Sequence, residues 1–326
     1  MSRDKPRSDS LVDEVRPAGD RHGRMPPASA PAPAMSGHGR TTMRACSIAL
    51  ALNACLVATA VHAACPDAAA ISGFVADWEA KRPAKALPVA NPDDAVCARG
   101  KLVAELQGRL GKVIGYKAGL TAKAVQERFK ADGPVSGVLF EKMLLSDGAK
   151  LPAAYGARPV WEADMLLVVK DEGINTAKTP DEALRHISGM RPFIELPDLA
   201  LAPSETLDGT QLLAINVAAR FGVAGAEIPL TADAATVALL ADTKIVATDG
   251  SGAVLAEGTG AATLGNPLNS VVWLVQDLAK AGRKLSAGDL ISVGSFSPLT
   301  PPKPGQQVTV RYEGFADTPK VSVQFE

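Results

Sequence analysis

The chain has 326 residues, of which 47% are hydrophobic and 21% charged, and its formal net charge at pH 7 is −1. This length and hydrophobic content suit one globular domain of roughly 200–250 residues together with additional sequence. The nearly neutral charge gives no electrostatic attraction to nucleic acid or to an anionic membrane, so neither is expected as a partner.

The start of the chain predicts a leader and a signal peptide. Residues 1–42 are rich in Arg, Pro, Ser and Gly and hold too few apolar side chains for a core, so we expect them to be disordered. Arg44 then precedes an apolar run over 45–60, and small residues stand just before position 64. This pattern predicts a secretory signal peptide over 43–63, with a buried helix as the alternative.

Export would decide the chemistry of the remaining cysteines. Cys46 and Cys55 leave with the signal peptide, so a mature chain that begins at residue 64 keeps only Cys65 and Cys97. Two cysteines in an oxidising compartment predict a disulfide, with two free buried cysteines as the alternative. We therefore expect a periplasmic protein with one disulfide. Three methionines are candidates for the translation start: Met1, Met35 and Met43.

Helical patterns come first in the mature chain, and strand patterns dominate later. Apolar residues recur at helical spacing over 66–82 and 93–110. The further expected elements are, in chain order, a strand over 112–119, a helix over 122–130, a loop-rich stretch over 131–152, a strand over 159–169, a helix over 180–188, a strand around 195, a hairpin over 242–257, a helix over 267–281 and strands over 289–293, 307–312 and 321–325. This order predicts an α+β fold in one domain over 64–326, with a helical part (64–110) and a strand-rich core (111–326).

Two carboxylates in the strand over 159–169 form the strongest candidate site. Glu162 and Asp164 are two residues apart, so their side chains share one face of an otherwise apolar strand. Two like charges so close together are costly to bury unless a cation neutralises them. Oxygen-only ligands favour a hard ion such as Mg²⁺ or Mn²⁺. The alternative is a strand end whose acids are solvated or paired with Arg or Lys.

Histidine and cysteine chemistry is largely excluded. Of the four histidines, only His186 remains after signal cleavage, so a zinc site with several His ligands cannot form. His186 falls late in a polar predicted helix, where a solvated side chain is expected. Proton transfer is therefore left to carboxylates, Lys, Tyr or water on a metal.

Several short motifs occur in a fixed order between about residues 100 and 325. They are Gly115-Tyr116-Lys117-Ala118-Gly119-Leu120-Thr121, Gly137-Val138-Leu139-Phe140, Glu162-Ala163-Asp164, Glu195, and Gly265-Asn266-Pro267-Leu268-Asn269-Ser270. Together they resemble the fumarylacetoacetate hydrolase superfamily, and within it the branch of 2-oxopent-4-enoate hydratases and 4-oxalocrotonate decarboxylases.

The resemblance implies a fold, a metal site and a ligand. The fold would be a mixed β-roll with peripheral helices. Glu162, Asp164 and Glu195 would hold one Mg²⁺ or Mn²⁺, and Lys117 would be the active-site lysine that relays protons. The resemblance also implies substrate contacts from Leu139 and Asn216. The partner would be a small 2-oxo acid, with no membrane partner after signal cleavage, and a homo-oligomer is compatible with this interpretation.

The activity implied is that of a metal-dependent lyase of hydratase type, acting on a small 2-hydroxy-dienoic or 2-oxo acid. One alternative is a 2-oxo-enedioate decarboxylase, and another is a non-catalytic periplasmic binding protein for an oxo acid. Lys117 favours an enzyme, whereas Val135, Ile215 and Ala218, at positions where the family carries polar groups, favour a binding protein. Hydrolases of the superfamily use a His–Glu pair in a segment before the strand that carries the metal ligands. No His occurs in that segment of the mature chain, so hydrolysis is disfavoured. A cytoplasmic location, usual for the aromatic catabolism in which this family acts, is the alternative to export.

Overall fold

The computed structural model describes residues 65–326, which all fall within one compact unit. The predicted leader (1–42) and signal peptide (43–63) lie outside the described residues. Within the described part, no helix has the length and apolar character needed to cross a membrane.

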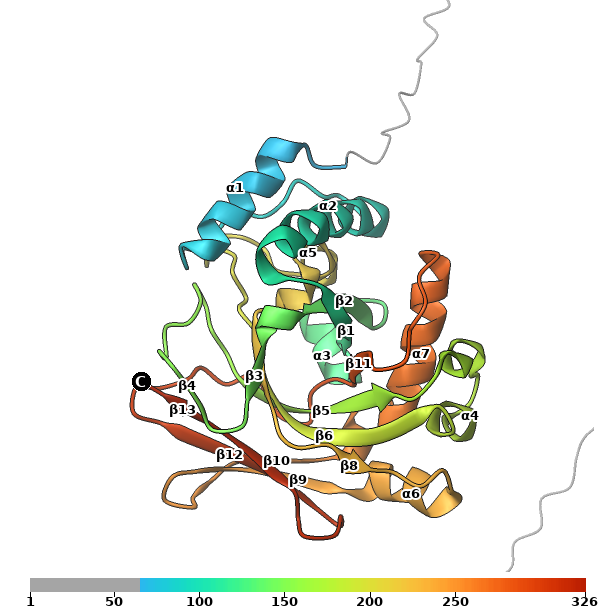
Figure 1. Ribbon diagram of the computed structural model, residues 1–326. Helices are drawn as coiled ribbons and strands as arrows, with labels where there is room; N and C mark the ends of the chain where they lie inside the picture. Colours follow the sequence, from blue (N-terminus) through green and yellow to red (C-terminus); the bar gives the residue numbers. More distant parts are fainter. Residues whose placement is uncertain (1–64) are drawn as a thin grey trace, which may run out of the picture. The chain divides into compact units, whose positions relative to one another are not determined.

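Two sheets form the centre of the fold (Figure 1). The larger has the order β2-β1-β11-β5-β6-β7-β3, with β8 paired to β6, and the smaller has the order β10-β9-β12-β13-β4. The strands are β1 (Val113–Gly119), β2 (Val135–Phe140), β3 (Leu144–Ser146), β4 (Ala149–Leu151), β5 (Glu162–Val169), β6 (Ile187–Leu196), β7 (Phe221–Ala224), β8 (Ile228–Pro229), β9 (Lys244–Asp249), β10 (Val254–Thr259), β11 (Leu290–Ser292), β12 (Gln307–Glu313) and β13 (Lys320–Phe325).

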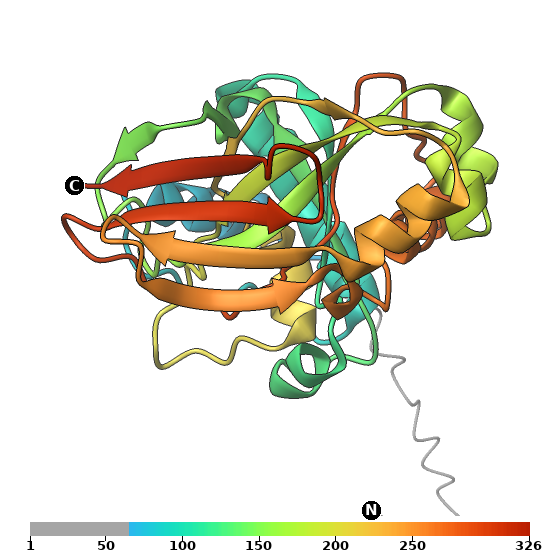
Figure 2. The same ribbon diagram turned by 90° about the horizontal axis from the view of Figure 1, so that it is seen from below.

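The main apolar core lies between these sheets. Figure 2 shows the four strands β9, β10, β12 and β13 of the smaller sheet side by side, with the larger sheet behind them. Met165 and Leu167 of β5 pack in the same buried cluster as Val310 of β12 and Val323 of β13. Alternate residues of β12 and β13 are buried, as expected for strands with one face on a core. β5 is buried along its whole length, which fits its central position.

Helices cover the edges of this arrangement (Figure 1). They are α1 (Ala68–Glu79), α2 (Pro92–Leu110), α3 (Lys123–Arg128), α4 (Pro180–Leu184), α5 (Gly209–Ala214), α6 (Ala234–Asp242) and α7 (Pro267–Lys280), with short 3₁₀ helices at Glu141–Met143, Glu172–Thr176 and Gly260–Ala262 and a left-handed turn at Asn216–Ala218. α1, α2 and α5 pack on the β2 side of the larger sheet in a second apolar cluster. The α+β fold predicted from the order of the elements is therefore confirmed.

A disulfide joins Cys65, just before α1, to Cys97 in α2, with the two Cα atoms 5.5 Å apart. Local capping sets the adjacent helix starts: Asp67 accepts a hydrogen bond from the Ala70 amide, and Asn91 accepts one from the Asp94 amide. The disulfide therefore holds the segment before α1 against α2.

The predicted helix over 180–188 is partly wrong. α4 ends at Leu184, and β6 begins at Ile187, which pairs with Val169 of β5. Thr179 caps the helix start as expected, accepting a hydrogen bond from the Glu182 amide. Pairing with β5 then takes over the residues that the local pattern assigned to the helix.

Candidate active site

The site begins with a cross-strand pair of carboxylates. β5 and β6 are antiparallel, and their register places Glu162 directly opposite Glu195. Side chains directly opposite each other on one face of an antiparallel pair lie close together. Both residues line one cavity and are at least nine-tenths buried. Folding therefore brings together two acids that are 33 positions apart in the sequence.

Asp164 lies two residues further along β5 and is completely buried. Its carboxylate accepts hydrogen bonds from the Ser292 hydroxyl at 2.5 Å and from the Gly294 amide at 3.2 Å. It does not line the cavity. In this structure the carboxylate is thus bound to the end of β11 and the segment after it, beside the Glu162–Glu195 pair.

Lys117 of β1 brings a buried cation to the same place. Its ammonium forms an ion pair with Glu195 and donates a hydrogen bond to the Val217 carbonyl at 3.0 Å. Gly137 lies opposite Lys117 in β2, and a Cβ atom there would come within 3.0 Å of the Lys117 side chain. Glycine at position 137 therefore makes room for the lysine stem.

The buried charges do not balance. Burial, and then the charge of Glu195, raise the pKa of Glu162 well above its ordinary range. The same two causes, in the same order, raise the pKa of Asp164 to about 7. Three carboxylates thus share one buried lysine. This excess of negative charge on oxygen donors is the chemistry that a hard dication satisfies.

The carboxylates are not gathered around one point. Between residues 65 and 326, no group of three or more His, Cys, Asp or Glu side chains is arranged to hold a metal ion. Glu162 and Glu195 face the cavity, whereas Asp164 is bound to Ser292 and Gly294. The three carboxylates fit a dication in donor type and in charge. Glu162 and Glu195 offer their oxygen atoms at the cavity, and Asp164 lies beside them.

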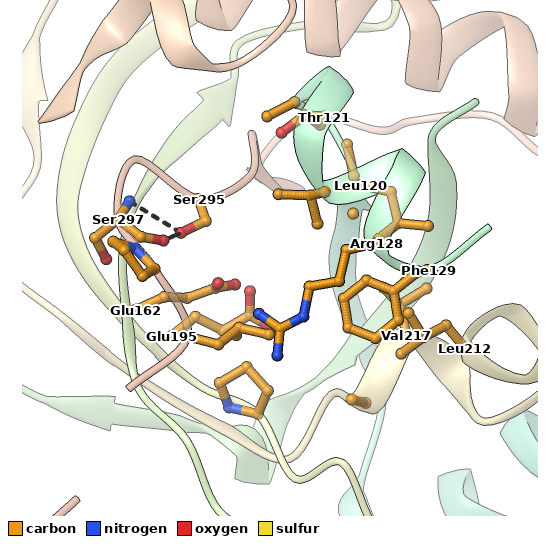
Figure 3. A pocket seen from close by; sticks show the side chains of 18 of the residues that line it. Leu120, Thr121, Arg128, Phe129, Glu162, Glu195, Leu212, Val217, Ser295 and Ser297 are labelled. Atoms are coloured by element: carbon orange, nitrogen blue, oxygen red, sulfur yellow. Dashed lines mark hydrogen bonds between the residues drawn. The ribbon is translucent and has the colours of Figure 1, made fainter. Parts of the chain in front are cut away.

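The cavity next to these acids has a volume of about 400 Å³. In Figure 3, Glu162 and Glu195 lie on one side with Ser295 and Ser297, from the segment after β11. Leu120, Phe129, Leu212 and Val217 lie across from them, and Arg128 extends from α3 toward the two acids. The cavity therefore has an acidic side and an apolar side. These apolar residues, Arg128 and the two serines carry no sequence signal that would have identified them.

The two predicted substrate contacts lie outside this cavity. The side-chain amide of Asn216 accepts a hydrogen bond from the Val138 amide at 2.7 Å and donates one to the Val138 carbonyl at 2.9 Å, so it holds β2. Leu139 lines a separate small cavity that it shares with Phe193 and Glu195. The structure gives Asn216 a structural role, and neither residue is brought to the main cavity.

An unusual backbone places the residue after Asn216. Asn216, Val217 and Ala218 have φ angles of 58°, 52° and 56°, in the left-handed region that non-glycine residues rarely adopt. This conformation directs the Val217 carbonyl to Lys117 and leaves Val217 lining the cavity. Such strain is concentrated at functional sites in proteins.

In amino-acid sequence the chain is similar to several bacterial 2-keto-4-pentenoate hydratases. The 2-keto-4-pentenoate hydratase of Burkholderia vietnamiensis strain G4 is 30% identical over 203 residues, which cover 62% of this chain and 75% of that protein. The 2-keto-4-pentenoate hydratase of Paraburkholderia xenovorans strain LB400 is 28% identical over 240 residues, covering 73% of this chain and 86% of that protein. No family model matches the chain.

A solved structure shares the fold. 4-Oxalocrotonate decarboxylase from Pseudomonas putida G7, complexed with magnesium and adipate, superposes with a TM-score of 0.71 at 24% identity, covering 79% of this chain and 96% of that one. The predicted roll-type fold with peripheral helices is thereby confirmed. The chain belongs to the branch of the fumarylacetoacetate hydrolase superfamily that comprises the 2-keto-4-pentenoate hydratases, which are hydro-lyases, and the 4-oxalocrotonate decarboxylases.

Proposed function

We propose that this protein is a metal-dependent hydratase that adds water to the conjugated C=C bond of a small 2-hydroxy-dienoic or 2-oxo acid. The observation that carries the proposal is Lys117, a buried cation in contact with Glu195, inside a cavity that also holds Glu162. The relatives named hydratases support the same reaction type.

The proposed metal ligands are Glu162, Asp164 and Glu195, and the ion is Mg²⁺ or Mn²⁺. When bound, the dication would act as a Lewis acid that stabilises negative charge developing on the substrate's oxygen atoms. The excess of buried carboxylates over buried cations supports this assignment. The solved decarboxylase with the same fold was crystallised with magnesium, which supports a divalent ion in general.

Lys117 is the proposed proton carrier. Lys117 lines the cavity, and its ammonium is held by Glu195 and by the Val217 carbonyl, so its position is fixed before a substrate enters. A fixed ammonium can give a proton to a substrate carbon, and the amine that remains can take one from the attacking water. Water addition then balances without a redox cofactor: the π bond of the C=C group and one O–H bond of water break, and one C–O and one C–H bond form.

Product analysis tests the proposed reaction. Incubated with 2-hydroxypenta-2,4-dienoate and Mg²⁺, the protein should yield a 4-hydroxy-2-oxo acid, identified by NMR. Release of CO₂ from a 2-oxo-enedioate, without hydration of the dienoate, would support the decarboxylase instead, a reaction for which the decarboxylase relatives argue. If both compounds bind and neither is consumed, the binding-protein interpretation replaces the enzyme.

Export to the periplasm is part of the proposal. It is supported by the basic and apolar pattern over 43–63 and by the disulfide between Cys65 and Cys97, since disulfides persist in oxidising compartments.

A further inference from the structure

We propose that the substrate is a 2-oxo or 2-hydroxy-dienoic monoacid with an extended apolar tail, which lies against the apolar side of the cavity. This inference rests on the proposed function for the 2-oxo acid end of the substrate. It adds the chemical class of the other end, the tail. The tail site is an apolar wall composed of Leu120, Val125, Phe129, Leu199, Leu212 and Leu299.

The apolar wall is continuous although it is assembled from distant segments. Leu120 follows β1, Val125 and Phe129 belong to α3 or its end, and Leu212 belongs to α5. Leu120, Phe129 and Leu212 are buried in one cluster, against which the other three residues of the wall pack. Water against such a surface is released when an apolar group covers it, which favours a ligand with a hydrophobic tail.

The volume of the cavity exceeds what the small acids need. A volume of about 400 Å³ falls in the range of roughly 300–1,000 Å³ found for sites of drug-sized ligands, whereas a five-carbon dienoic acid has about eight non-hydrogen atoms. If the acid group lies at Glu162 and Glu195, such a ligand leaves the opposite wall uncovered. A longer tail would fill this space.

The charge distribution argues against a second carboxylate on the tail. All six residues of the apolar wall are hydrophobic, so the wall offers no side-chain donor to an anion. Lys117 is already paired with Glu195. The other cation that lines the cavity, Arg128, extends toward Glu162 and Glu195 in Figure 3, to the acidic side of the cavity. A buried carboxylate without a partner would be strongly disfavoured.

A binding series with unreactive acids tests the tail site. Saturated 2-oxo acids lack the C=C bond, so their affinities are independent of turnover. Calorimetry with the mature protein and saturating Mg²⁺ should show affinity rising about 3- to 4-fold per methylene from pyruvate through 2-oxopentanoate to 2-oxooctanoate. Val125→Phe, which fills part of the wall, should reduce this dependence on length, whereas Val96→Phe on the exposed side of α2 should leave it unchanged.

Two results would overturn the proposal. The first is an affinity that is independent of tail length in the unmodified protein. The second is tighter binding of 2-oxooctanedioate than of 2-oxooctanoate, with the advantage lost in Arg128→Met, because Arg128 would then hold a second carboxylate. If no 2-oxo acid binds at all, including pyruvate, the proposed function itself fails, so the two failures are distinguishable.

Discussion

Replacing Lys117 with Met tests how the buried charges are balanced. Lys117 is 3% exposed and Glu195 is 2% exposed, so the ion pair between them is shielded from water. Removing one partner of a buried pair typically costs about 3–5 kcal/mol, because the remaining charge stays buried without compensation. Met keeps most of the apolar stem, so packing losses should be small. We therefore expect a loss of this size in the free energy of unfolding of the metal-free protein.

A bound dication should change that result. If Glu162, Asp164 and Glu195 hold a divalent ion, its charge replaces the lost ammonium, and the destabilisation should fall to roughly 1–2 kcal/mol with saturating Mg²⁺. Urea unfolding followed by tryptophan fluorescence, in EDTA and in Mg²⁺, measures both values. The variant should retain metal binding but lose hydration activity by about 10²–10⁴-fold, since the proton carrier is gone.

Lys112→Met is the matched control, because Lys112 is exposed and immediately precedes the same strand. It should change the free energy of unfolding by less than about 0.5 kcal/mol. An equal loss in Lys117→Met with and without Mg²⁺ would refute the charge argument. Unchanged turnover in that variant would remove Lys117 from the reaction.

Three further predictions follow from other parts of the molecule. Glu162→Gln should lower Mn²⁺ affinity by at least ~100-fold in calorimetry, because removing a direct metal ligand should reduce affinity more than removing a residue that only supports a ligand; an unchanged affinity would exclude Glu162 as a ligand. Burial and the charge of Glu195 raise the pKa of Asp164 from 3.8 to about 7, so its contribution to the stability of the metal-free protein should be greatest below about pH 4 and fall by at most ~4 kcal/mol as pH rises to 7; a contribution that rises over that window, taken as the difference from Asp164→Asn in urea unfolding, would contradict this. Reducing the Cys65–Cys97 disulfide should lower stability by about 3–4 kcal/mol, and mass spectrometry of the exported protein should find a crosslinked peptide pair and an N-terminus at Ala64 or Cys65.

Local patterns in the sequence predicted the elements that surround the site. Alternating and apolar positions identified β5, and Gly111, with a φ of 86°, ends α2 where the sequence predicted. Composition could not predict that Glu195, the one acid on β6, faces Glu162. That pairing depends on the register between two strands joined by α4 and its flanking turns, and register is fixed by tertiary packing.

The cavity could be predicted only in part. Lys117 and the two glutamates were identified through short motifs, because each motif keeps its residues close together in the chain. The apolar wall has no such signal, since Leu120, Leu212 and Leu299 come from three separate segments. Asn216 shows the converse limit: the resemblance predicts it as a substrate contact, and only the structure reveals that its side-chain amide is hydrogen-bonded to Val138.

The most direct test of the proposed function is a magnesium titration of metal-stripped protein during turnover. Loss of the ultraviolet absorbance of 2-hydroxypenta-2,4-dienoate reports hydration. The proposed site predicts no loss in EDTA and a rate that rises with Mg²⁺ or Mn²⁺ until the ion site is saturated. Equal rates in EDTA and in Mg²⁺ would contradict a metal-dependent hydratase, as would no consumption of either this dienoate or a homologue with a longer apolar tail at any concentration of either ion.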